Sequence, residues 1–158
     1  MSFRTIYLMA MRKVRHIILT IYFVLLSFQA FAIPQRPQPQ RLVNDFSGIL
    51  SNAQEAELES MLVAFDDSTS NQIVVVIVND LEGDTASSYA YAIGERWGVG
   101  NEDFNNGIVL LVKPKTEDSS GLVSIQVGYG LEGAIPDVYC KRIIDNFLLP
   151  NFRQGDIY

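Results

Sequence analysis

The sequence contains a single histidine, His16, and it lies close to the start of the 158-residue chain. Everything that follows it is without an imidazole side chain. A Ser-His-Asp or Cys-His nucleophilic system, a phosphohistidine intermediate and a histidine-ligated zinc site are therefore excluded for the main part of this chain. Acid–base chemistry would fall to carboxylates, tyrosine or lysine. Any metal site would be rich in oxygen ligands, which suits calcium, magnesium or manganese.

Cysteine and basic residues are also scarce. Cys140 is the only cysteine, so it has no internal disulfide partner, and its helical spacing from Ile143, Ile144 and Phe147 indicates a small buried hydrophobe. The chain has 12 Lys and Arg against 18 Asp and Glu, a formal net charge of −6. We expect no nucleic-acid partner, because binding a phosphate backbone needs the opposite balance of charge.

Residues 1–32 have the pattern of a secretory signal peptide. A basic region, an apolar run and an A-x-A-like cleavage site follow one another: Arg12, Lys13 and Arg15; residues 17–28; and Ala30 to Ala32. The apolar run is shorter than the roughly 20 residues that span a bilayer as a helix, so a membrane anchor is the less favoured alternative. Removing this segment would delete four basic residues and no acidic one, and the net charge would change from −6 to −10. We predict an exported protein, located in the periplasm or on the outer face of a membrane.

Residues 33–40, IPQRPQPQ, are predicted to be a Pro/Gln-rich linker, since three prolines in eight residues leave no core pattern. The stretch 41–158 is long enough to form one domain with its own core. Its last residues, FRQGDIY, resemble the beginning of another element, so a further helix or tail is expected beyond Tyr158.

Hydrophobic periodicity predicts an α/β fold. The runs QIVVVIV and IVLLV are apolar without alternation, as in strands that are buried on both faces by helices. A helix between these two strands makes them parallel, whereas the short loop 113–121 makes the next strand return antiparallel. We therefore expect a mixed sheet of about four strands with helices on both sides. The predicted strands are 41–43, 72–78, 108–112 and 122–127, and the predicted helices are 52–65, 86–97 and 137–149, the last ended by Pro150.

Two polar loops should converge at one edge of this sheet. In the predicted hairpin, the end of strand 122–127 lies beside the start of strand 108–112, so loop 98–107 meets loop 128–133. One interpretation is an oxygen-ligand site for a hard cation. The other is that the asparagines form turns and Asp137 caps a helix, and the spacing leaves both open. The neighbouring polar residues would be Glu102, Asp103, Asn105, Asn106 and Glu132, with Asp137 close by.

The segment GYGLEG (128–133) matches the dinucleotide-binding pattern G-x-G-x-x-G. Its context does not fit that motif, because Pro136 stands where the helix interior would be and the preceding strand is expected to be antiparallel. A Walker A sequence is also absent. We therefore predict no nucleotide cofactor.

Three segments together resemble the TPM domain family: VNDFSGILS (43–51), RWGVGNEDFNNGIVLLV (96–112) and VGYGLEGAIPD (127–137). The resemblance extends over residues 41–158. It implies a three-layer α/β/α sandwich on the extracytoplasmic side of a membrane and an acidic patch associated with divalent cations, calcium foremost, with magnesium or manganese as alternatives. Carried over by motif, it implies Asp45, Asp103 and Asp137 as metal ligands, with Asn106 and Glu132 as supporting groups. The topology by itself places Asp45 at the other end of the sheet.

Two functions are compatible with these features. The first is a non-catalytic, cation-binding module that assists the assembly or maintenance of membrane-associated proteins, and it needs only acidic loops and export. The second is a metal-dependent acid phosphatase, the activity described for some TPM proteins, which would act on a phosphate ester. We favour the first, because the converging motifs contain no basic residue other than Arg96. The sequence assigns no catalytic residue.

Overall fold

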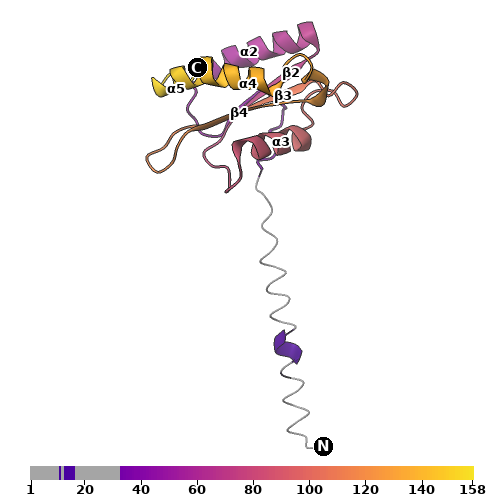
Figure 1. Ribbon diagram of the computed structural model, residues 1–158, viewed down its shortest axis with the longest axis vertical. Helices are drawn as coiled ribbons and strands as arrows, with labels where there is room; N and C mark the ends of the chain where they lie inside the picture. The colour runs from indigo at the N-terminus through magenta and orange to yellow at the C-terminus, as the bar shows by residue number, and fades with distance from the viewer. Residues whose placement is uncertain (1–10, 12, 17–32) are drawn as a thin grey trace, which may run out of the picture. The chain divides into compact units, whose positions relative to one another are not determined.

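The computed structural model describes residues 11, 13–16 and 33–158. The chain divides into two compact units, residues 1–32 and 33–158, and the second contains the sheet and the helices that cover it (Figure 1). The predicted cleavage site lies outside the described residues, and the signal peptide stays a prediction. Among the helices of the described part, none has the length and apolar character needed to cross a membrane.

Four strands form one mixed sheet in the order β1-β2-β3-β4. Strands β1, β2 and β3 are parallel and β4 is antiparallel to β3, as the sequence predicts. The bounds are Val43–Asp45 for β1, Gln72–Ile77 for β2, Gly107–Lys113 for β3 and Leu122–Val127 for β4.

Strand β1 begins two residues later than predicted. The Glu59 carboxylate accepts hydrogen bonds from the backbone N–H groups of Leu42 and Val43, at 2.7–3.0 Å. Arg41 forms salt bridges with Glu55 and Glu59. The start of the segment is therefore bound to a helix by side chains, while the Leu42 carbonyl still accepts from the Val75 N–H of β2 at 2.7 Å. The Glu59 carboxylate thus satisfies backbone N–H groups of an edge strand.

Helices cover both faces of the sheet, which confirms the three-layer arrangement. In Figure 1, α2 (Asn52–Thr69) lies on the same face as α4 (Asp137–Ile143) and α5 (Leu149–Arg153), and α3 (Ala86–Trp97) covers the other face. Ser51 and Gln54 form a capping box at the start of α2 and bond reciprocally at 3.3 and 2.9 Å. Helix α3 ends where predicted, because Gly98 adopts the left-handed conformation (φ +59°) that favours glycine.

The prediction that Pro150 ends the last helix is wrong. Between α4 and α5 the chain forms a π-helical turn, η2 (Ile144–Leu148), and Pro150 then stands in the first turn of α5. A proline is tolerated in a first turn, where its missing N–H has no intrahelical partner to lose. The wider π turn allows the first turn of α5 to begin while the helical segment continues.

The core lies between the sheet and the helices on its two faces. Val74 and Val76 of β2, Leu111 of β3 and Ala90 and Ile93 of α3 have no exposed surface. Consecutive apolar residues in β2 are buried whichever face they point to, which is what the unbroken run QIVVVIV predicts.

The predicted linker has no helix or strand, but it is attached to the domain. The indole N–H of Trp97 donates to the carbonyl of Pro34 at 2.8 Å, and the Arg36 guanidinium donates to the carbonyl of Trp97 at 2.7 Å. Ile33 packs against the core cluster. Residues 33–36 are therefore part of the folded unit.

Candidate functional site

The register of the sheet brings the two predicted loops together. Ile108 near the start of β3 pairs with Val127 at the end of β4, so the loop before β3 and the loop after β4 leave the same edge. The Gly128 N–H donates to the carbonyl of Gly107 at 2.7 Å, and the Gly130 N–H donates to that of Asn105 at 3.1 Å. The predicted convergence of loops 98–107 and 128–133 is confirmed.

The glycines of the second loop allow this close backbone contact. A Cβ atom placed on Gly128 would lie 2.2 Å from the carbonyl oxygen of Asn105, and one on Gly130 would lie 1.8 Å from that of Phe104. No side chain fits at such distances. Between them the chain forms a short 3₁₀ turn, η1 (Tyr129–Leu131). The glycine pattern therefore serves the packing of one loop on the other.

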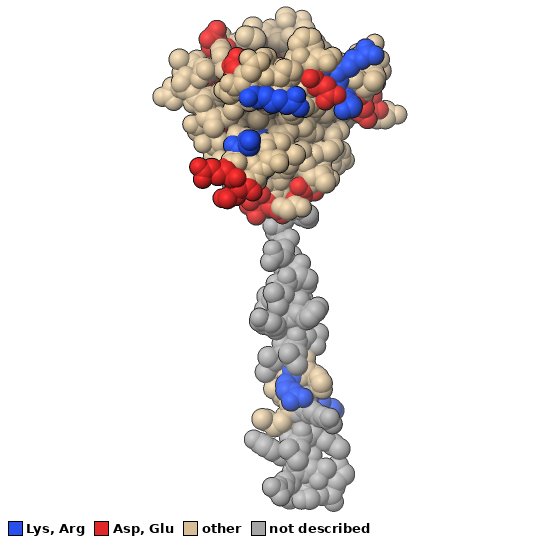
Figure 2. Space-filling view, turned by 60° about the vertical axis from the view of Figure 1, so that its left-hand side comes forward, with Lys and Arg blue, Asp and Glu red and all other residues tan. Residues whose placement is uncertain are grey.

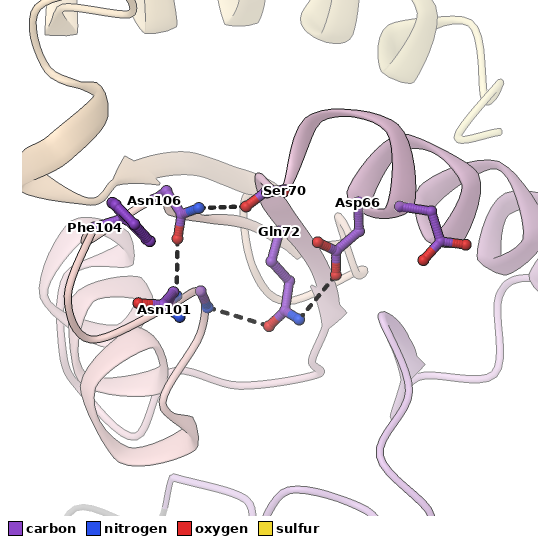
Figure 3. Close-up of a pocket in the computed structure, with 8 residues that line it drawn as sticks. Asp66, Ser70, Gln72, Asn101, Phe104 and Asn106 are labelled. Carbon is purple, nitrogen blue, oxygen red and sulfur yellow. Dashed lines mark hydrogen bonds between the residues drawn. The ribbon is translucent and has the colours of Figure 1, made fainter.

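Asn106 joins three segments of the chain at this edge. The residue is 7% exposed, its Oδ1 accepts from the Asn101 N–H at 2.8 Å, and its Nδ2 donates to the carbonyl of Ser70 (Figure 3). Its own carbonyl accepts from the Gln72 N–H at 3.2 Å. Asn106 thus connects the end of α2, the start of β2 and loop 98–107, which is a positioning role.

A cavity of about 520 Å³ opens beside Asn106, and we call it the α2-side cavity. Gln72 crosses it, with Nε2 donating to the Asp66 carboxylate and Oε1 accepting from the Gly100 N–H, both at 3.2 Å (Figure 3). Asp67 also lines it, and the exposed ring of Phe104 stands at its rim. Neither aspartate is among the residues predicted from the sequence. The feature of the sequence that could have identified them is their position near the end of a helix that precedes a buried strand.

A second cavity, the α3-side cavity, lies on the other side of the same loop. It has a volume of about 300 Å³, and its charged lining residues are Glu95 of α3 and Glu132 of the glycine loop. Tyr91 and Tyr129, 55% and 80% exposed, add phenol rings. Glu95 was also missed, although it stands four residues after Tyr91 on the polar side of α3.

The predicted ligands do not share one cavity. Asn106 lines the α2-side cavity and Glu132 lines the α3-side cavity. Asp103, in loop 98–107, and Asp137, the first residue of α4, are exposed to solvent at this edge. These residues therefore lie on neighbouring loops without forming a closed cage. Within residues 11, 13–16 and 33–158, no three His, Cys, Asp or Glu side chains are grouped so as to hold a metal ion.

Asp45 lies at the opposite edge. It pairs with Ile77 in the parallel ladder, whereas Gly107 pairs with Gln72, and five residues of strand separate these levels by roughly 16 Å. The Asp45 carboxylate accepts from the backbone N–H groups of Ser47, Gly48 and Leu50 at 2.8–2.9 Å. An ion with ligands at about 2.4 Å cannot bridge this distance, so Asp45 and the loop carboxylates cannot bind the same ion.

The charged side chains that line the two cavities are acidic, and a basic group beside the α2-side cavity is the Arg36 guanidinium, which donates to Gln72 Oε1 at 3.5 Å. The residues described as lining the two cavities include four carboxylates, two in each, and no lysine or arginine. Figure 2 shows the domain with the left-hand side of Figure 1 turned forward, and both acidic and basic side chains are visible on that face. An excess of carboxylates attracts cations and repels phosphate esters.

Comparison with known proteins agrees with this fold. A family model described as the TPM domain matches residues 43–158. The solution NMR structure of the N-terminal domain of a protein from P. gingivalis is 36% identical in sequence, with a TM-score of 0.64, and the alignment covers 74% of this chain and 72% of that one. No curated protein matches the chain.

Proposed function

The chain belongs to the TPM domain family, and from this premise we propose that it is an extracytoplasmic module that binds a divalent cation at the loop edge. In this role it would assist the assembly or maintenance of membrane-associated proteins. The proposal combines three features: the secretory pattern of residues 1–32, the converging loops, and a loop edge lined by carboxylates.

The charges that line the two cavities favour a cation over an anion as the ligand. The α2-side and α3-side cavities, on either side of loop 98–107, each have two carboxylates and, among their described lining residues, no lysine or arginine. A phosphate ester entering either cavity would meet like charge. A hard cation would meet the oxygen ligands that it prefers.

The proposed ligands are Asp103, Glu132 and Asp137, of which only Glu132 lines a cavity. Because no three such side chains of the described residues are grouped as a metal site, the cation would bind at the exposed loop surface and draw them together. All three are exposed and stand on segments that backbone hydrogen bonds hold together. Calcium fits such an open set best, because it accepts six to eight oxygens in flexible geometry and takes water and backbone carbonyls beside carboxylates. Bound there, the cation would neutralise the loop edge and supply a Lewis-acidic centre. Asn106 supports the site by fixing loop 98–107.

The test is a calcium titration of the domain 33–158, followed by amide NMR shifts and by thermal unfolding. We expect saturable shifts confined to residues 101–107 and 128–138, with a dissociation constant of about 10⁻⁴–10⁻³ M, as in extracellular calcium modules. The double variant Asp103→Asn, Glu132→Gln should lose the response. Glu117→Gln, an exposed carboxylate in the β3–β4 loop, should keep it. The absence of any shift at about 10 mM calcium, magnesium or manganese would refute the site.

A metal-dependent phosphatase is the second candidate. The observation in its favour is that Asp137 is exposed at the start of α4, so one carboxylate at this edge is available as a nucleophile or base. Hydrolysis of an aryl phosphate that needs the cation and is lost in Asp137→Ala would establish this alternative. Cation binding without hydrolysis supports the non-catalytic module.

A further inference from the structure

A third cavity lies at the edge of the sheet opposite the glycine loop, and we call it the hairpin cavity. It has a volume of about 690 Å³ and is lined by the ends of β3 and β4, the loop that joins them, and the C-terminal segment with α5. Lys113, the last residue of β3, pairs with Leu122, the first of β4. Figure 1 shows the β3–β4 loop and α5 at the same end of the domain. The hairpin cavity is therefore separate from the proposed cation site.

Most of the wall of the hairpin cavity is apolar. The wall combines two kinds of surface, the side chains of two paired strands and those of a short helix and its extension. Leu122 is 45% exposed, so an apolar side chain beside the cavity is open to solvent. An alkyl chain lying here would remove this surface from water, which is favourable. The apolar lining residues are Val112, Leu122, Val123, Leu149, Phe152 and Ile157.

The charged residues of this wall are all basic. Lys113, Lys115 and Arg153 line the hairpin cavity, and its described lining residues include no carboxylate. These are three of only eight Lys and Arg in residues 33–158, which hold 18 Asp and Glu. Lys115 and Arg153 are exposed and form no salt bridge within the described residues. The carboxylates nearest in sequence do not line the cavity: Glu117, Asp118 and Asp156.

The environment of Lys113 is the strongest indication that this cavity binds an anion. Its residue is only 8% exposed, and its ammonium group donates to the Ser119 hydroxyl and to the Ser120 carbonyl. An ammonium has three N–H donors, and a buried charge is normally paired with an opposite one. Among the described residues Lys113 has no carboxylate partner. A buried cation beside an open cavity lacks a counter-anion, and a ligand can supply it.

We infer that the hairpin cavity binds an anionic amphiphile with a single alkyl chain, such as a fatty carboxylate. The chain lies against the apolar wall and the carboxylate accepts hydrogen bonds from Lys113 and Arg153. Cavities of about 300–1,000 Å³ with a mainly apolar lining and a few polar groups are typical of small-molecule sites. An acidic, hydrophobic peptide shares this chemistry, but peptides are usually recognised along a strand edge or a long helical groove.

The probe for this site is sodium dodecanoate, kept below its micelle concentration and titrated into ¹⁵N-labelled residues 33–158. We expect amide shifts in residues 112–123 and 149–157, and none in the glycine loop. Lys113→Met, which keeps the aliphatic stem, and Arg153→Gln, on the exposed side of α5, should each weaken binding about tenfold. Lys141→Gln, an exposed lysine on α4, is the matched control and should bind as the wild type does. Unchanged affinity in both cavity variants would overturn the inference.

Two further probes test the chemistry of the ligand. Dodecyltrimethylammonium has the same chain with a cationic head and should not bind, so equal binding of both amphiphiles would overturn the role of the three basic residues. A short peptide of alternating leucine and aspartate should bind more weakly than dodecanoate. Tighter binding of the peptide to the same residues would overturn the amphiphile in favour of a polypeptide partner. The calcium titration reports on residues 101–107 and 128–138, whereas the dodecanoate titration reports on residues 112–123 and 149–157. A negative result in one titration therefore leaves the other proposal untouched.

Discussion

Asp45 shows how one carboxylate can organise a turn. It follows the buried Val43 and Asn44 in β1, and its two oxygens accept three backbone N–H groups of the segment that leads into α2. These N–H groups lie in a turn with Gly48 in the left-handed region (φ +69°), where no sheet or helix bond serves them.

Replacing Asp45 by alanine should therefore lower stability without affecting the cation site. We expect a decrease of about 1–3 kcal/mol in the free energy of unfolding, because a charged acceptor of several hydrogen bonds is lost. Urea denaturation measures this. The calcium response should be unchanged, since Asp45 lies at the other edge of the sheet. A lost calcium response in a folded Asp45→Ala protein would show that the site is built differently from our proposal.

Cys140 is a second residue whose environment makes a clear prediction. It is buried in a small cluster with Ile108 and Val127. Burial raises the pKa of the Cys140 thiol, and the nearby Asp137 carboxylate raises it further. The folded state thus holds the thiol proton more tightly than the unfolded chain, whose thiol titrates near about 8.5. The stabilisation is fully present below the unfolded pKa and is lost as the pH rises through the folded pKa.

Two measurements follow for Cys140. Native protein at pH 8 should react with a thiol reagent at least about tenfold more slowly than protein unfolded in urea, because a buried thiol with a raised pKa is inert. The alkaline loss of stability should be smaller in Cys140→Ala than in the wild type. As the chain has one cysteine, the labelling signal belongs to this residue. Equal labelling rates in the two states would contradict the burial.

At the scale of elements, the glycine loop and loop 98–107 are two layers in backbone contact. Gly130→Ala would place a methyl group 1.8 Å from the carbonyl oxygen of Phe104, so one layer must move. We expect a loss of about 1–3 kcal/mol in unfolding free energy, together with shifted amide signals for residues 103–107.

Gly133 offers a matched control in the same loop. A Cβ placed on it has no atom within 4 Å, and its backbone is outside the left-handed region. Gly133→Ala should therefore change stability by no more than about 0.5 kcal/mol. If Gly130→Ala were as neutral as Gly133→Ala, the close packing of the two loops would be refuted.

The elements differ in how far the sequence predicts them. Strand β4 has the predicted bounds, because alternation and two flanking glycines delimit it. The sequence correctly predicts that a helix begins after Pro136. The helical segment continues past Pro150 because the chain changes locally to a π turn, and the periodicity of apolar residues does not predict such a change. The extra turn of α2, to Thr69, is polar and carries no apolar repeat beyond Phe65.

The candidate site is likewise predicted only in part from the sequence. The convergence of the two loops follows from strand order and loop length alone, so Asp103, Asn106 and Glu132 are predicted as neighbours. Asn106 and Glu132 line different cavities because their side chains lie on different sides of loop 98–107, and Asp103 lines neither cavity; the spacing of the residues does not specify this. Asp66 reaches the α2-side cavity from a helix that is distant in sequence from loop 98–107, through tertiary packing, whereas Glu95 lies only three residues before that loop.

For the whole molecule, the dominant electrostatic property is an excess of negative charge. Residues 33–158 have a formal net charge of −10, since the four basic residues before them are not part of the domain. Arg41 forms salt bridges with Glu55 and Glu59, and Lys141 forms one with Asp145. Residues 33–158 have 18 carboxylate side chains and only eight Lys and Arg, so carboxylates are in excess, and their mutual repulsion destabilises the compact state.

Added sodium chloride should stabilise this domain by screening that repulsion. Between about 0.01 M and 1 M salt the Debye length falls from about 30 to 3 Å, so the midpoint of thermal unfolding should rise by about 2–5 °C. Removing two remote charges with Glu117→Gln and Asp118→Asn should reduce the slope. Calcium at matched ionic strength should raise the midpoint beyond sodium chloride, and this excess should disappear in Asp103→Asn, Glu132→Gln. An equal effect of the two salts would show that calcium acts only by screening.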